Sequence, residues 1–196
     1  MNSQHRSSMR QEQPRAYTTG TVEFINDEWI FFDEETDEAF LLEDIAHVHI
    51  EVLKNGWLKG ELKEKGRVIL AKSIYRLQNG DMVRIQKALL HSYDCWLEQL
   101  DDSTFYQFIS SLNQLGYSMY DCIYCHNQLL YSQTPKTGRG VNFLIFDNEE
   151  SICSMHHHYN FNESPPIIRF EFTESHGHRM LRTIYNWNDD GIEDSG

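Results

Sequence analysis

Short runs of alternating hydrophobic and polar residues fill the chain from Ala16 to about Lys87. They include TGTVEFI, WIFFD, AFLLE, HVHIEVL, WLKGEL and RVILA, and polar turns such as NDE, KNG and KEKG separate them. Alternation with a period of two predicts half-buried β-strands, and short strands at regular spacing are typical of small barrels. We therefore expect a small β-barrel domain, closest to an SH3-like barrel, over residues 16–88.

The hydrophobic period changes after Lys87. Apolar side chains recur at helical spacing in two groups: Leu90, Tyr93, Trp96, Leu97 and Leu100, then Phe105, Phe108, Ile109, Leu112 and Leu115. This spacing predicts helices over about 89–100 and 104–115, and the period of two returns after Gly116. The predicted fold class is α+β, in which the barrel is followed by a helical pair and a mostly antiparallel C-terminal sheet. Residues 89–187 form the predicted second domain.

Both ends of the chain are polar. Residues 1–15 lack the apolar stretch of an export signal and residues 188–196 are acidic, so both are predicted to be disordered tails. No apolar run approaches the roughly 18 residues of a membrane-spanning helix. These patterns predict a cytoplasmic protein with no membrane partner, whose four cysteines are thiols or metal ligands.

Charge is distributed unevenly along the chain. The formal net charge of −13 argues against nucleic acid as a partner, because a polyanion would be repelled. Residues 52–90 nevertheless carry nine Lys or Arg against three acids, and Trp57 follows a turn in this segment. A surface for a protein or peptide partner is predicted there, against the alternatives of a core tryptophan and a solvated charged face. Its candidate residues are Trp57, Lys54, Lys59, Lys63, Lys65 and Arg67.

Four residues have the spacing of a zinc site. Cys122 and Cys125 form a C-x2-C pair, Cys153 and His156 form a C-x2-H pair, and 27 residues separate the pairs. Zinc takes four tetrahedral sulfur or nitrogen ligands, so a Cys3His site is one hypothesis. On a straight strand, however, residues i and i+3 point to opposite faces. The strand-forming dipeptide Ile123-Tyr124 therefore favours the competing interpretation, buried strand cysteines that bind no metal.

Two further arrangements involve histidines. The segment Cys122–His126 matches C-x-x-C-H, the pattern of covalent haem attachment, although that attachment normally takes place outside the cytoplasm. His156 and His158 share one face of a strand by their H-x-H spacing. A catalytic metal centre would use them with residues of the SHGH hairpin, namely Glu174, His176 and His178. The alternative is that the hairpin histidines are exposed turn residues.

The segments TGTVEFINDEWIFFDEETDEAFLLE and YDCIYCHNQLLY resemble a family of uncharacterised cytosolic proteins from Bacillus-type bacteria, a domain of unknown function. The resemblance extends from about Ala16 to Trp187, and it implies a bacterial cytoplasmic setting without an activity, cofactor or catalytic residue. The sequence as a whole predicts a non-enzymatic binding or protein-interaction module that needs no cofactor. The alternative is a zinc-dependent enzyme or a zinc-stabilised domain that uses the C-terminal cysteines and histidines.

Overall fold

The computed structural model describes residues 3–46, 49–131 and 137–185, in two compact units. The N-terminal unit comprises residues 8–88, and the C-terminal unit comprises residues 89–196 together with residues 1–7. The acidic tail predicted at 188–196 lies outside the described residues. No helix in the described ranges is long and apolar enough to cross a bilayer.

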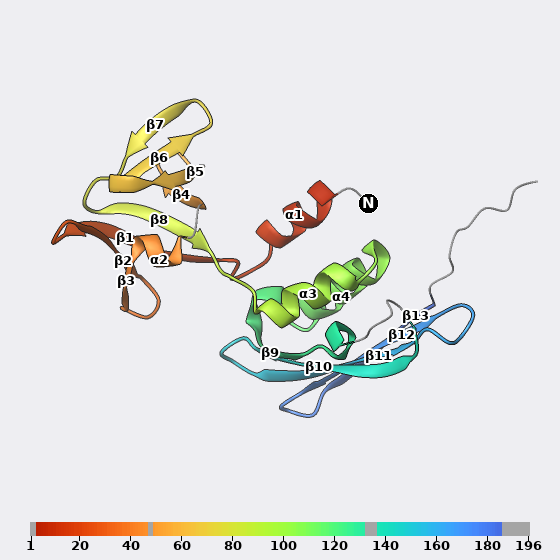
Figure 1. Cartoon of the computed structure of the whole chain (residues 1–196). Coiled ribbons are helices and arrows are strands. Elements are labelled where there is room, and N and C mark those ends of the chain that lie inside the picture. Colours follow the sequence, from red (N-terminus) through yellow and green to blue (C-terminus); the bar gives the residue numbers. More distant parts are fainter. Residues whose placement is uncertain (1–2, 47–48, 132–136, 186–196) are drawn as a thin grey trace, which may run out of the picture. The chain divides into compact units, whose positions relative to one another are not determined.

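The N-terminal unit is one antiparallel sheet of eight strands (Figure 1). The strands are β1 (Tyr17–Ile25), β2 (Glu28–Asp33), β3 (Ala39–Leu41), β4 (His49–Leu53), β5 (Trp57–Lys63), β6 (Arg67–Leu70), β7 (Ser73–Arg76) and β8 (Asp81–Gln86). Their order is β3-β2-β1-β8-β4-β5-β6-β7. β8, the last strand of this unit along the chain, thus lies in the middle of the sheet between β1 and β4. Two short helical turns, α2 (Leu42–Ile45) and η1 (Glu64–Gly66), follow β3 and β5.

The predicted SH3-like barrel is wrong, because this sheet is open. Among the described residues, β3 and β7 form the two edges and do not pair with each other. They are only three and four residues long, so they offer few backbone groups for closing a barrel. The chain is mostly β, with one sheet in each unit. The period of two located strands, but it does not encode which strands become neighbours.

The sheet curves around one hydrophobic core. Its fully buried side chains include Val22, Phe31, Val52, Val68 and Val83. The indole of Trp29 on β2 packs against Gly66 in η1, so closely that a Cβ at residue 66 would overlap its Nε1. Since β2 and η1 belong to opposite halves of the sheet, this contact requires the sheet to be strongly curved.

The tail predicted at residues 1–15 contains a helix, α1 (Ser3–Gln11). Arg6, in the first part of α1, which belongs to the C-terminal unit, binds the residues at the start of another helix of that unit. Its Nε donates to Oδ1 of Asp102 at 2.7 Å, and its Nη2 donates to the carbonyl oxygen of Leu100 at 2.7 Å. The guanidinium also lies 4.8 Å from the centroid of the Phe105 ring. The hydrophobic pattern does not predict this helix, because a charged side chain, and not an apolar stripe, makes these contacts.

The C-terminal unit is a five-stranded antiparallel sheet with helices α3 (His91–Gln99) and α4 (Asp102–Gln114) on one face (Figure 1). The strands are β9 (Cys122–His126), β10 (Arg139–Asp147), β11 (Ile152–Asn160), β12 (Ile167–Glu174) and β13 (Arg179–Tyr185), in the order β13-β12-β11-β10-β9. The 3₁₀ turns η2 (Met119–Asp121) and η3 (Gln128–Tyr131) flank β9. Buried aromatic rings fill the layer between helices and sheet: Tyr93, Trp96, Phe108, Phe146 and Phe170.

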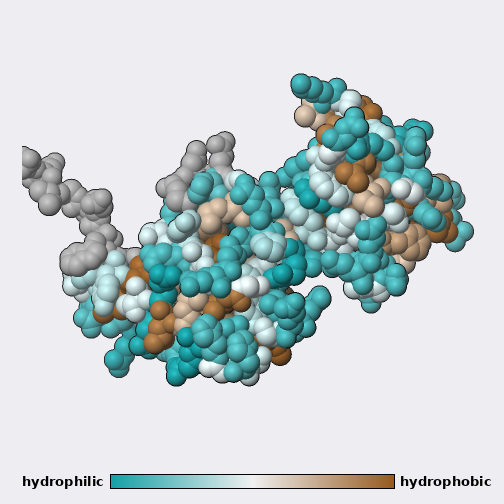
Figure 2. Space-filling model, turned by 180° about the vertical axis from the view of Figure 1, so that it is seen from behind, coloured by the Kyte–Doolittle hydropathy of each residue, from teal (hydrophilic) through white to brown (hydrophobic). Residues whose placement is uncertain are grey.

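The two faces of this sheet differ in burial. On β11, Cys153, Met155, His157 and Tyr159 are buried beneath the helices, whereas His156 and His158 point to the other face and are half-buried. No described element of this unit covers that second face (Figure 1). Figure 2 shows apolar patches among hydrophilic atoms on one side of the molecule, so polar groups do not cover the surface evenly.

Candidate functional site

The strand that carries Cys122 and Cys125 is bulged. Cys125 pairs with Leu144, whereas Cys122 pairs with Phe146, so Ile123 is an extra residue on β9. Directly opposed residues point to the same face of a sheet, and both partners are buried toward the helices. The two cysteines therefore share one face. The expectation that a straight strand sends them to opposite faces is wrong, because a bulge shifts the alternation by one residue.

The third cysteine lies two strands away from the first. Cys153 on β11 and Cys122 on β9 both pair with Phe146, from opposite sides of β10. Neighbouring strands lie about 4.8 Å apart, so roughly 9.6 Å separates the two backbones. His156 points to the other face of the sheet. The structure thus brings Cys122 and Cys125 to one face but does not assemble the predicted set of four. In the described part of the chain, no cluster of three candidate metal ligands contains a cysteine.

Burial also keeps these thiols protonated. It raises the pKa of Cys125 and of Cys153 to about 11, and it raises the pKa of Cys122 as well. Zinc binds the thiolate, so a high thiol pKa opposes metal binding. The hydroxyl of Ser92 donates to the carbonyl oxygen of Cys125 at 3.0 Å and ties the edge strand to α3. The surroundings of the cysteines are those of packing residues.

Two histidines and a glutamate meet on the uncovered face of the C-terminal sheet. His156 and His158 are two residues apart on β11, and Glu171 on β12 pairs directly with His156. One ligand atom from each lies within 4.8 Å of the others. Nε2 of His158 is buried. It lies 3.5 Å from Oε2 of Glu171, which is longer than a usual hydrogen bond, and it has no hydrogen-bond partner among the described residues.

Burial and neighbouring groups set the protonation of His158 and Glu171. Burial, and then the positive charge of Arg169, lowers the pKa of His158, which favours the neutral imidazole. Arg179 on β13 donates from Nη2 to Oε1 of Glu171, and this hydrogen bond lowers the pKa of Glu171. A neutral imidazole and an ionised carboxylate are the forms that bind metal ions. The three side chains therefore have the chemistry of a three-ligand metal site.

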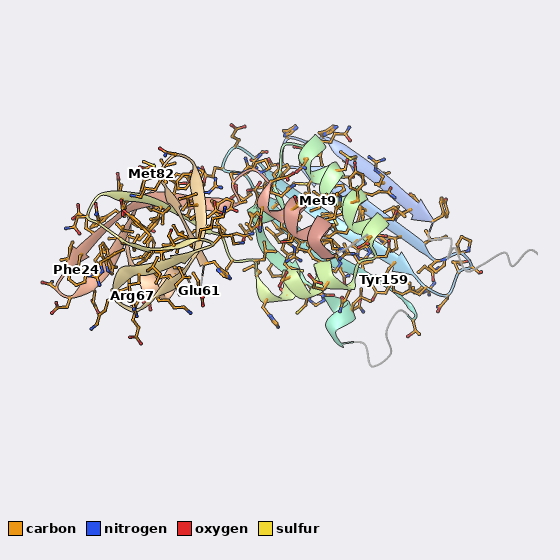
Figure 3. All side chains as sticks on the ribbon, turned by 90° about the horizontal axis from the view of Figure 1, so that it is seen from above. Met9, Phe24, Glu61, Arg67, Met82 and Tyr159 are labelled. Carbon is orange, nitrogen blue, oxygen red and sulfur yellow. The ribbon has the colours of Figure 1, made fainter. Side chains whose placement is uncertain are left out.

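A cleft of about 640 Å³ adjoins His158 at one end of the sheet. Strands β10 to β13 line it, and none of the described residues that line it is acidic. Its polar side chains include Arg139, Arg169, Thr183 and Tyr185. Tyr159, labelled in Figure 3, also borders it, but its side chain is buried beneath the helices. Two guanidinium groups and two hydroxyls are suited to an anionic group such as a carboxylate or a phosphate.

The hairpin histidines form a separate cluster. Glu174, His176 and His178, at the turn between β12 and β13, also have ligand atoms within 4.8 Å of one another. Nδ1 of His178 donates to Oε2 of Glu174 at 2.6 Å, so this carboxylate already has a strong partner. The carboxylate beside the β11 histidines is Glu171. Residue spacing does not predict this carboxylate, because only the register of β11 and β12 brings it opposite His156.

Four of the six residues predicted for the basic surface lie together. Trp57, Lys59 and Lys63 occupy alternate positions of β5 and so share one face, and Arg67 on β6 pairs with Lys63. Figure 3 shows Arg67 together with Glu61, which carries an ion pair with Lys63. This is the face of the N-terminal sheet opposite its hydrophobic core, and we call it the outer face.

The other two predicted residues lie elsewhere. Nζ of Lys54 pairs with Asp81 at 2.8 Å and lies 4.3 Å from the centroid of the Tyr75 ring, which packs against the core. Lys65 lines a cleft of about 1050 Å³ whose rim includes Phe24, labelled in Figure 3. Five carboxylates line this cleft: Asp27, Glu28, Glu43, Asp44 and Glu64. Lys65 therefore faces an acidic environment and not the basic surface.

Arg84 completes the outer face. Its guanidinium lies 4.1 Å from the centroid of the Tyr17 ring and 4.6 Å from that of the Trp57 ring. Nη2 of Arg84 pairs with Oε2 of Glu51 at 2.6 Å, and the Tyr17 hydroxyl donates to Oε1 of Glu51 at 3.2 Å. Trp57 is thus half-buried beside a fixed cation. The sequence does not predict the role of Arg84, because its neighbours come from β1, β4 and β5.

Residues 4–184 match a family model described as "Protein of unknown function (DUF2777)". The chain is also similar to "Uncharacterized protein YisN" of Bacillus subtilis (strain 168), with 28% identity over 177 residues that cover 90% of each chain. No solved structure matches the chain.

Proposed function

The chain belongs to the family described as "Protein of unknown function (DUF2777)", which confirms the resemblance, and we propose that it is a non-enzymatic interaction module. Its ligand in this proposal is an extended acidic segment of a partner protein, bound on the outer face of the N-terminal sheet. The family description and the name of the relative carry no activity, so the proposal depends on surface geometry. A cytoplasmic location remains a prediction.

The observation that carries the proposal is the position of Arg84 between two aromatic rings. The guanidinium lies within 4.6 Å of the ring centroids of both Tyr17 and Trp57. A cation over an aromatic face stabilises the pair by about 0.5–1 kcal/mol at exposed sites, so the half-buried Trp57 ring is held in place before a ligand arrives. An aromatic side chain that is already ordered loses little conformational entropy on binding.

Charge supports an acidic ligand. Over β4, β5, β6 and β8 the outer face carries four cations and two carboxylates, an excess of two positive charges in a chain of net charge −13. The cations are Lys59, Lys63, Arg67 and Arg84, and the carboxylates are Glu51 and Glu61. Leu53 and Ile69 lie on the same face and are 36% and 43% exposed. Basic and apolar side chains on one face suit an extended segment whose facing residues, every second one along the chain, include both acidic and apolar side chains.

The test is binding of short synthetic peptides, measured by fluorescence anisotropy. Eight-residue peptides that carry Glu and then Leu or Tyr in turn at every second position, with Ser between them, should bind, more weakly as salt rises. The same peptides with Lys in place of Glu should not bind. Trp57→Ala should weaken binding about tenfold or more, since a buried aromatic anchor contributes about 2 kcal/mol. Lys59→Glu with Lys63→Glu should abolish the preference for Glu.

Lys72→Glu is the matched control, because Lys72 is exposed in the turn between β6 and β7. It should leave peptide affinity within about twofold of the wild type. Tighter binding of short RNA or DNA than of the acidic peptides would replace this proposal with nucleic-acid binding. Equal affinity of wild type and the Trp57→Ala variant would remove the outer face as the binding surface.

A further inference from the structure

We propose that His156, His158 and Glu171 form a three-ligand site for a divalent transition metal ion, with zinc the best match. We further propose that the adjoining cleft binds the carboxylate or phosphate group of a small anionic ligand at that metal. The site is in the C-terminal unit and shares no residue with the outer face of the N-terminal sheet. It also differs from the Cys3His set, of which it retains only His156.

Strand geometry fixes the two imidazoles. His156 and His158 are separated by one residue, so both point away from α3 and α4, and the intervening His157 is buried beneath the helices. Glu171 enters the same face from β12 because it is paired directly with His156. All three ligand atoms come from the interior of two hydrogen-bonded strands. Such positions are held more accurately than positions on a loop.

The distances are close to those of a bound ion. Ligand atoms within 4.8 Å of one another need to approach to roughly 3.3 Å around a zinc ion with bonds of about 2.0–2.1 Å. A change of this size is within reach of side-chain rotation. Two histidines with one carboxylate form a common ligand set of zinc enzymes and of non-haem iron sites, and it leaves a coordination position for a further ligand.

The hydrogen bonds around the group also match a metal site. Nε2 of His158 is buried and forms no hydrogen bond of normal length with the described residues, since its contact with Oε2 of Glu171 is 3.5 Å long. Oε1 of Glu171 accepts a hydrogen bond from Arg179, and Oε2 is the oxygen that faces His158. Ligating carboxylates commonly keep such an outer partner, which orients the second oxygen.

The anionic ligand follows from the neighbouring cleft. His158 lines the cleft of about 640 Å³ together with Arg139 and Arg169, so a candidate metal ligand and two fixed positive charges adjoin one space. A carboxylate or phosphate oxygen is a good zinc ligand, and its remaining oxygens can accept bidentate hydrogen bonds from arginine. A neutral ligand would leave these guanidinium groups without a matching charge.

The first experiment measures metal stoichiometry of the untagged full chain by mass spectrometry after dialysis against zinc. Wild type should retain about one zinc per chain. His156→Gln with His158→Gln, and separately Glu171→Gln, should lower zinc affinity at least tenfold in competition with a chromophoric chelator. The matched control is His176→Gln with His178→Gln, which removes the same number of histidines and should leave the affinity unchanged. Zinc binding that is lost on substitution of the hairpin pair His176 and His178, or of Cys122, would overturn the assignment.

A measurement on the wild-type chain covers the case in which a variant does not fold. Addition of Co²⁺ should give visible absorption bands of a four- or five-coordinate site, and the ring protons of two histidines should shift in the NMR spectrum. Addition of inorganic phosphate or succinate to the cobalt-loaded chain should then change those bands, and Arg169→Gln should weaken that effect at least fivefold without loss of cobalt. The absence of cobalt bands would refute the metal site. Bands that do not change on addition of either anion would refute the anionic ligand.

Discussion

The indole Nε1–H of Trp96 donates a 2.9 Å hydrogen bond to Nδ1 of His157, so a helix side chain fixes the tautomer of a buried histidine in the sheet. Indole is only a donor, and Nδ1 must therefore be the unprotonated nitrogen. Nδ2 of Asn142 lies 3.1 Å from the same nitrogen. Burial lowers the pKa of His157 to about 3, so the native state keeps this imidazole neutral.

The first prediction is a loss of stability on acidification. Above pH 6.5 both states hold His157 neutral, but between pH 6.5 and 3 only the unfolded chain protonates it. The free energy of unfolding should then fall by about 1.4 kcal/mol per pH unit from this residue alone. Urea unfolding from pH 7 to 5 in the presence of a chelator should give a shallower pH slope for His157→Gln than for wild type. Identical slopes would contradict the assignment.

The second prediction compares two glycines of the N-terminal unit. Gly66 and Gly80 have φ of +66° and +83°, so alanine costs about 1 kcal/mol of backbone strain at each. A Cβ at residue 66 overlaps the indole of Trp29, whereas a Cβ at residue 80 has nothing described within 4 Å. Gly66→Ala should therefore reduce the free energy of unfolding by a further 1–3 kcal/mol, roughly, relative to Gly80→Ala. Equal losses in urea titrations would mean that Trp29 moves aside without cost.

The third prediction concerns the N-terminal helix. Arg6→Ala removes the hydrogen bonds to Asp102 and to the carbonyl oxygen of Leu100, so the C-terminal unit should lose about 1–2 kcal/mol of unfolding free energy. Arg6→Lys keeps the charge but not the planar fork, and should recover only part of the loss. Ser7→Ala, at an exposed position of α1, is the control and should have little effect. An unchanged urea midpoint for Arg6→Ala would show that α1 does not depend on this contact.

The fourth prediction is that the thiols of the half-buried Cys125 and the buried Cys153 react slowly. With a pKa of about 11, Cys125 and Cys153 are almost fully protonated at pH 8. Alkylation by iodoacetamide should be roughly a hundredfold slower in the native protein than in urea, as measured by mass spectrometry of the labelled peptides. Rapid native labelling of either residue would indicate a thiolate and would restore the case for a cysteine metal site.

The sequence predicted individual elements better than their pairing. Helices α3 and α4 lie in the two segments with helical spacing, because apolar periodicity is a local property. Asn79-Gly80 is a turn, but the strands on either side are not partners: β7 pairs with β6, and β8 pairs with β1 and β4. Oδ1 of Asn79 instead accepts a hydrogen bond from the backbone N–H of Phe24, which is distant in sequence. The open sheet depends on such pairings and contacts between residues that are distant in sequence.

The same limit applies to the candidate sites. The shared face of His156 and His158 follows from the period of two, and it was predictable. Glu171 and Arg84 were not, because each reaches its neighbours only through the register of another strand. The bulge at Ile123 was not predictable either. Nothing in the dipeptide Ile123-Tyr124 disfavours a regular strand, and the bulge arises from how β9 meets β10.

That bulge also affects association between molecules. β9 is an edge strand of the C-terminal sheet, and the exposed Ile123 would favour intermolecular pairing if the strand were regular. The extra residue breaks the even spacing of the free backbone amides and carbonyls, so a strand from a second molecule finds no continuous ladder to extend. An irregularity that brings two cysteines to one face therefore also disfavours edge-to-edge pairing at the β9 edge of the sheet.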